Sequence, residues 1–83
     1  MTNKNALKFG DIVSVKAEVY VAPRCRHFVK IGHGAHTKMF FVEDAHDEYI
    51  QGIYIGGTGA NITVTFNTTG GCVTTEVSRE DLV

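Results

Sequence analysis

Hydrophobic and polar residues alternate along most of this chain, and helical periodicity is nearly absent. In residues 11–21, DIVSVKAEVYV, five apolar side chains fall on one face, and Ser14, Lys16, Glu18 and Tyr20 fall on the other. The five are Val13, Val15, Ala17, Val19 and Val21. Alternation with period two is typical of a strand with one buried face. We therefore predict one long strand over 11–21, which Pro23 ends because proline cannot donate a hydrogen bond to a ladder.

Further segments with strand character are bounded by polar or glycine-rich turns: 26–31, 38–43, 49–56, 61–67 and 72–77. The pattern is cleanest in NITVTFN, where Ile62, Val64 and Phe66 point inward and the polar residues between them point outward. Gly52 interrupts the strand over 49–56, and a bulge or bend is expected there. Ser78 and Asp81 have the spacing of a capping box, which predicts a short 3₁₀ turn after the last strand.

The length of the chain limits the fold. Its 83 residues form a single domain, 1–83, which buries only about 60–65% of the surface that the unfolded chain exposes. Five or six short antiparallel strands in so few residues leave few edges open if the sheet bends strongly. The predicted fold is therefore all-β, a small bent barrel with a long hairpin and a C-terminal 3₁₀ turn.

Four segments of the chain resemble a known group of folds. The opening FGDIVSV, the later GIYIGG and ITVTF, and the closing CVTTEVSREDLV are similar to the SH3-like small barrels. The matching residues are Gly10, Asp11, Val13, Val64, Phe66, Val77, Leu82 and Val83. The resemblance implies a Gly-Asp start to the first strand and a hydrophobic plug after the last turn. It implies a binding role but names no ligand, because this group binds proteins, RNA, ribosomes or polymerases.

Charge divides the chain into two halves. Residues 1–42 carry seven Lys or Arg and two acids, a net +5, whereas residues 43–83 carry one Arg and seven acids, a net −6. No acid lies between residues 19 and 42. We predict that a basic hairpin over 24–43 projects from the barrel and forms the contact face, with these residues: Arg24, Arg26, Phe28, Lys30, His33, His36 and Lys38. A second, acidic face is expected at Glu43, Asp44, Asp47 and Glu48.

The basic hairpin also suggests metal binding or catalysis, and both interpretations are weak. Cys25, His27, His33 and His36 are suitable zinc ligands, but their spacing is not a common zinc pattern and no second C-x2-C element accompanies them. Arg24 and Arg26 would lower the pKa of Cys25, yet no oxyanion element follows. We expect no catalytic residue, metal or cofactor.

Two classes of function remain. The first is a non-catalytic protein-binding module, and small stand-alone proteins of this kind include phage-type accessory or inhibitory factors that act on host machinery. The alternative is an RNA- or DNA-binding small barrel that uses the same basic and aromatic face, where charge follows phosphates and rings stack on bases. The rings in this alternative are Tyr20, Phe28, Phe40 and Phe41. The absence of a secretion signal and of a long apolar run predicts a cytoplasmic protein with no membrane contact, either a monomer or a homodimer.

Overall fold

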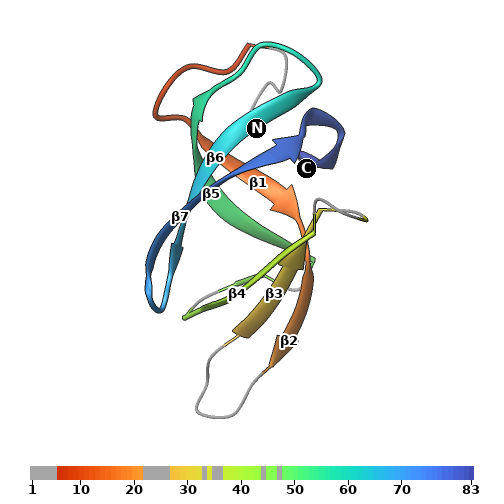
Figure 1. Cartoon of the computed structure of the whole chain (residues 1–83), viewed down its shortest axis with the longest axis vertical. Coiled ribbons are helices and arrows are strands. Elements are labelled where there is room, and N and C mark those ends of the chain that lie inside the picture. The colour runs from red at the N-terminus through yellow and green to blue at the C-terminus, as the bar shows by residue number, and fades with distance from the viewer. Residues whose placement is uncertain (1–5, 22–26, 33, 35–36, 44, 47) are drawn as a thin grey trace.

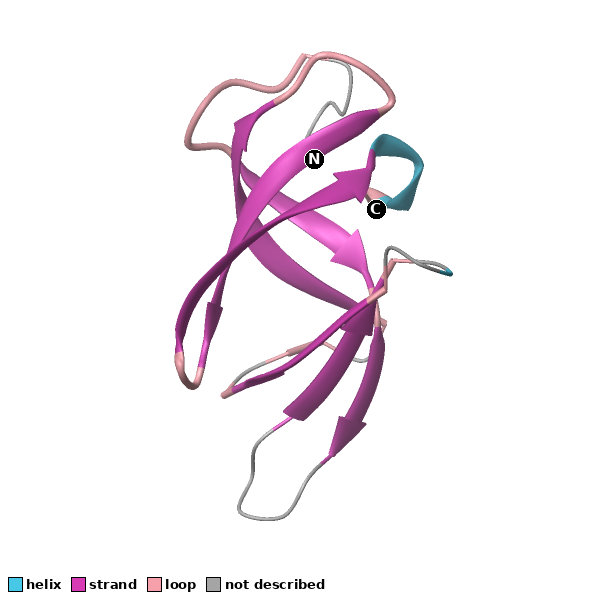
Figure 2. Cartoon of the chain, in the orientation of Figure 1, coloured by secondary structure: helices cyan, strands magenta, loops and turns pink. Residues whose placement is uncertain are grey.

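The computed structural model describes residues 6–21, 27–32, 34, 37–43, 45–46 and 48–83. Its strands are β1 (Ile12–Lys16), β2 (Glu18–Val21), β3 (His27–Ile31), β4 (Lys38–Val42), β5 (Tyr49–Gly56), β6 (Asn61–Thr68) and β7 (Gly71–Ser78). They form two antiparallel sheets, one of four strands in the order β1-β5-β6-β7 and one of three in the order β2-β3-β4 (Figures 1 and 2). The all-β prediction is confirmed, but closure into a barrel is not found in the described part of the chain.

The long strand predicted over 11–21 is divided between the two sheets. The break falls at Ala17, whose backbone N–H donates to the Glu48 carbonyl at 3.0 Å. Before the break, Val13 and Val15 are buried as predicted. After it, the prediction of a buried face fails at Val21, which is 80% exposed at the end of the edge strand β2.

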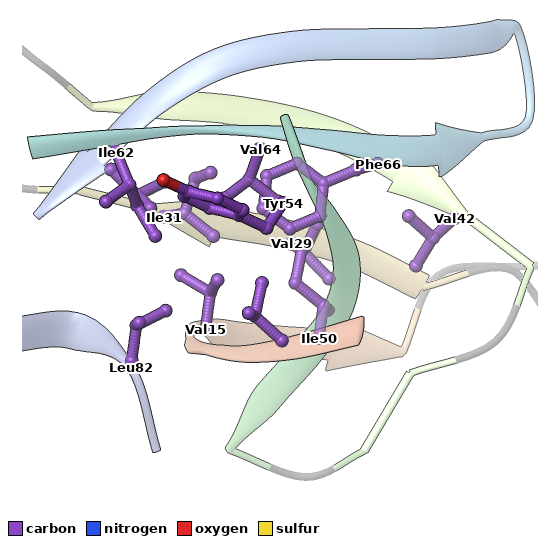
Figure 3. Close-up of a cluster of buried hydrophobic side chains, with 12 residues drawn as sticks. Val15, Val29, Ile31, Val42, Ile50, Tyr54, Ile62, Val64, Phe66 and Leu82 are labelled. Atoms are coloured by element: carbon purple, nitrogen blue, oxygen red, sulfur yellow. The ribbon is translucent and has the colours of Figure 1, made fainter. Parts of the chain in front are cut away.

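A single core fills the space between the inner faces of the two sheets (Figure 3). It comprises Val13, Val15, Val29, Ile31, Val42, Ile50, Tyr54, Ile62, Val64, Phe66, Val77 and Leu82. The predicted inward set of β6, Ile62, Val64 and Phe66, is confirmed. Phe40 of β4 packs against Phe66 with ring centroids 5.6 Å apart, so an aromatic contact joins the two sheets.

The C-terminal segment returns to the first strand. A 3₁₀ turn, Arg79–Asp81, follows β7, and its N-cap Ser78 accepts a hydrogen bond from the Glu80 N–H rather than from Asp81. Leu82 then pairs with Val15, and the Val83 N–H donates to the Ser14 carbonyl at 2.9 Å. The edge of β1 is covered in this way by the last residues of the chain.

Candidate functional site

Three aromatic side chains form a row across the outer face of the three-stranded sheet. The register places Tyr20 opposite Phe28 and Phe28 opposite Phe41. The ring centroids are 6.4 Å apart in the first pair and 5.1 Å apart in the second. Tyr20 is 52% exposed and Phe41 39% exposed, with Phe28 half-buried between them. This aromatic row, Tyr20–Phe28–Phe41, is an apolar surface that faces solvent.

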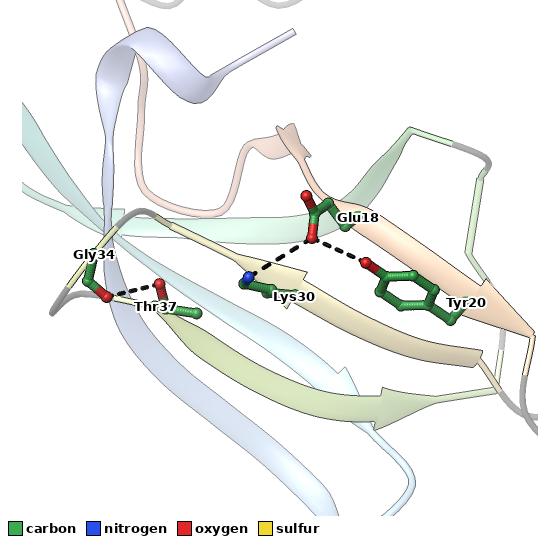
Figure 4. Close-up of polar contacts among 5 residues, drawn as sticks. All are labelled: Glu18, Tyr20, Lys30, Gly34 and Thr37. Carbon is green, nitrogen blue, oxygen red and sulfur yellow. Dashed lines mark hydrogen bonds and ion pairs between the residues drawn. The ribbon is translucent and has the colours of Figure 1, made fainter.

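A second row runs beside the first and carries the charges of this face. Glu18 lies opposite Lys30, and Lys30 lies opposite Met39, which is 60% exposed. The Lys30 Nζ is 3.8 Å from the Glu18 Oε2, and the Tyr20 hydroxyl donates to the same oxygen at 3.1 Å (Figure 4). Within the described residues of this face, the positive charge of Lys30 is therefore offset by Glu18.

Glu18 also raises the pKa of Tyr20 above its ordinary value of 10.0. The hydrogen bond that the phenol donates to the carboxylate is the main cause, and the negative charge of Glu18 adds to it. Both favour the neutral phenol. The contact therefore contributes to stability below about pH 10 and is lost as pH rises through the raised pKa of Tyr20.

Glu18→Gln is accordingly expected to lower the pKa of Tyr20 toward its ordinary value, because the charge that opposes ionisation is removed. The measurement is a pH titration of the Tyr20 Cζ chemical shift by NMR in wild type and variant. Glu43→Gln is the control, since it removes an exposed carboxylate that lines a different hollow from the one that Glu18 lines. Identical Tyr20 titration curves in wild type and Glu18→Gln would contradict the assigned contact.

The residues predicted for the contact face do not all lie together. Phe28 and Lys30 project from the outer face of β3. Lys38 is exposed but pairs with Ile31, a buried residue, so strand alternation places it on the opposite face from Lys30. The remaining predicted residues lie outside the described part of the chain: Arg24, Arg26, His33 and His36.

The turn between β3 and β4 is described only in part. Thr37 donates from its hydroxyl and from its backbone N–H to the Gly34 carbonyl, at 2.8 Å and 3.2 Å (Figure 4). Gly34 has a φ of 58°, a left-handed conformation that glycine adopts without strain. Glycine at this position therefore lets the turn form without backbone strain.

The predicted acidic face is divided as well. Glu43 and Glu48 are both exposed, whereas Asp44 and Asp47 lie outside the described residues. Glu43 lines a hollow of about 420 Å³ between β5, β6 and the segment after β4. Glu48 lines a different hollow of about 460 Å³, together with Lys16, Lys30 and Tyr49. The two described acids therefore belong to separate surfaces.

Tyr20, Phe41 and Met39 complete the outer face but are not among the residues predicted for the contact face. For Met39 and Phe41, strand alternation in the sequence predicts a position on the outer face. In KMFFV, Met39 and Phe41 share one face while Phe40 faces the core. The position of Tyr20 beside Phe28 follows only from the pairing of β2 with β3, which the sequence does not specify.

The described residues contain no group of three or more His, Cys, Asp or Glu side chains that could hold a metal ion. Three members of the candidate zinc set, Cys25, His33 and His36, lie outside them. Cys72 is an exposed free thiol whose Sγ donates to the Asn67 Oδ1 at 3.3 Å. The prediction that the protein binds no metal therefore stays a prediction.

Comparison with known proteins finds no family model, no curated protein and no solved structure that matches this chain. None of the helical structure in the described residues is long and apolar enough to cross a membrane.

Proposed function

We propose that this protein is a non-catalytic binding module that contacts a protein partner through the outer face of its three-stranded sheet. The observation that carries the proposal is the aromatic row, Tyr20–Phe28–Phe41. Aromatic side chains and methionine are enriched at protein interfaces because they bury a large area at low entropic cost. A neutral rim supports the same conclusion, since Lys30 is paired with Glu18 beside the row.

The proposal extends to the fold and to the rest of the site. We infer an SH3-like small barrel, supported by the pairing of Leu82 with Val15 and by the turn that precedes it. We include Arg24, Arg26 and Lys30 among the proposed partner contacts, whereas Lys38 lies on the face of the sheet opposite the aromatic row. His33 and His36 lie in the same stretch of sequence. A small module of this kind acts by occupying a surface of its partner, in the manner of an accessory or inhibitory factor.

Phe41→Ala tests the proposal, because it removes one end of the aromatic row. Immobilised wild type and variant are exposed to a nuclease-treated extract of the organism that encodes the protein, and bound proteins are quantified by mass spectrometry. The identified partner is then titrated by calorimetry. Phe41→Ala is expected to weaken that partner's binding by about 30-fold, the effect of losing an interface hot spot.

Ile55→Ala is the matched control. Ile55 is 37% exposed, close to the 39% of Phe41, but it belongs to β5 in the other sheet. Binding by Ile55→Ala should equal that of wild type. If Phe41→Ala and Ile55→Ala bind like wild type, the outer face of β2-β3-β4 is not the contact surface.

Binding of single-stranded nucleic acid is the second candidate, because a row of rings across three strands is also a platform on which bases stack. Salt dependence separates the two. For nucleic acid, affinity should fall steeply with salt, and each Lys or Arg removed should lower the salt slope by about one. For a protein partner, Arg24→Glu with Arg26→Glu should act mainly on the association rate.

A further inference from the structure

The strand β7 presents the longest open edge among the described residues. It ends the four-stranded sheet, and its eight residues, Gly71–Ser78, pair with β6 without a register shift. The other edges are shorter or covered. β2 has four residues, the Phe41 carbonyl of β4 accepts from the Thr69 N–H, and the last residues of the chain lie against β1.

Open strand edges are normally protected by lysine, proline or a bulge, because unpaired backbone groups bind further strands. The edge strand β7 has none of these, and its sequence, GCVTTEVS, holds one charged residue, Glu76. Of the three inward-facing side chains on β7, Val77 is buried like those on β6, but the other two are less buried. Val73 and Thr75 are half-buried, whereas Ile62, Val64 and Phe66 are buried.

The ladder identifies which backbone groups face outward. The Arg79 N–H donates to the Ala60 carbonyl at 2.8 Å, and these residues continue the β6–β7 register. Residues of an antiparallel pair alternate between bonding inward to the partner and facing away from it. Val77, Thr75 and Val73 therefore bond to β6, while the N–H and C=O groups of Cys72, Thr74 and Glu76 point away from the sheet.

We propose that this edge pairs with β7 of a second copy of the chain, in an antiparallel arrangement about a two-fold axis at Thr75. In that register Thr74 lies opposite Glu76 of the second copy, and Val73 lies opposite Val77. The side chains suit one another, because valine meets valine on the inner face and the carboxylate of Glu76 meets a hydroxyl rather than another carboxylate. The outward N–H and C=O groups of Thr74 and Glu76 then bond to each other across the axis, and the two sheets become one.

Charge at position 74 tests this register. Thr74 is exposed on the outer face, so Thr74→Lys and Thr74→Glu both leave the core intact. Lysine at 74 meets Glu76 of the second copy twice by symmetry, and glutamate at 74 meets it twice as a like charge. We expect the dimer dissociation constant to fall with Thr74→Lys and to rise with Thr74→Glu, each by about 2- to 30-fold.

The measurement is sedimentation equilibrium over a range of protein concentrations. Thr58→Lys and Thr58→Glu are matched controls, because they make the same changes of net charge in the exposed turn between β5 and β6, outside the proposed β7–β7 pair. Their dissociation constants should stay close to that of wild type. A wild type that is monomeric up to its solubility limit would overturn the proposal, and so would a loss of affinity with both Thr74→Lys and Thr74→Glu.

Hydrogen exchange of the wild-type chain supplies a test that needs no variant. The amides of Cys72, Thr74 and Glu76 should exchange quickly in dilute protein and more slowly as concentration rises, because the second strand protects them. The Val73 and Thr75 amides, bonded to β6, should be protected at every concentration. Exchange at Cys72, Thr74 and Glu76 that does not depend on concentration would contradict pairing through β7.

Discussion

Replacing Phe66 with alanine is expected to lower the free energy of unfolding by about 3–5 kcal/mol. Phe66 is 1% exposed, and its ring contacts Phe40 across the two sheets. Truncation therefore removes apolar contacts and leaves a cavity at the point where the sheets meet. Because small domains have a total stability of only about 5–10 kcal/mol, the variant should lose a large part of it.

The measurement is urea denaturation followed by circular dichroism, with Phe41→Ala as control. Phe41 is the same residue type on β4 of the other sheet, but it lies on the outer face and is 39% exposed. Its truncation should cost roughly 1 kcal/mol, since the site is open to water and no cavity remains. Equal losses of stability in the two variants would contradict the assignment of Phe66 to the core and of Phe41 to the outer face.

Alternation of residue types predicts the strands well because a half-buried strand has a strict period of two. The strands β3 to β7 lie within one residue of the predicted ranges at each end, and β5 matches 49–56 at both ends. The break at Ala17 was missed for a physical reason. The apolar alternation runs through that residue unchanged, while the partner strand changes from β5 to β3.

The candidate site was predicted only in part, because sequence groups residues by position along the chain and a binding face groups them across strands. Lys30 and Lys38 belong to the same basic stretch, yet the register places them on opposite faces of the sheet. Phe40 and Phe41 are neighbours, yet Phe40 packs against the core and Phe41 faces solvent. The aromatic row itself depends on the β2–β3–β4 register, which strand periodicity alone does not determine.

The role of Gly52 in the core likewise depends on contacts between strands, which the sequence does not show. These contacts support a second prediction of large effect. The sequence predicts a bulge or bend at this residue, but the register shift lies farther along β5, between Tyr54 and Gly56. Gly52 is instead a point of close packing, paired with Val13. A Cβ at this position would lie 2.5 Å from the Val64 Cγ1 and 2.8 Å from the Phe66 ring, both of which are buried.

Gly52→Ala is therefore expected to lower the free energy of unfolding by roughly 1–3 kcal/mol, because the core must move to admit one methyl group. Gly59→Ala is the control, since Gly59 is exposed and a Cβ there meets nothing within 4 Å. Adding Phe66→Leu to Gly52→Ala should recover part of the loss, because the smaller side chain leaves room for the new methyl group. The two substitutions should thus be non-additive in urea denaturation, as expected for residues in direct contact. Strict additivity, or a Gly52→Ala variant as stable as wild type, would mean that β5 does not approach β6 as closely as the structure places it.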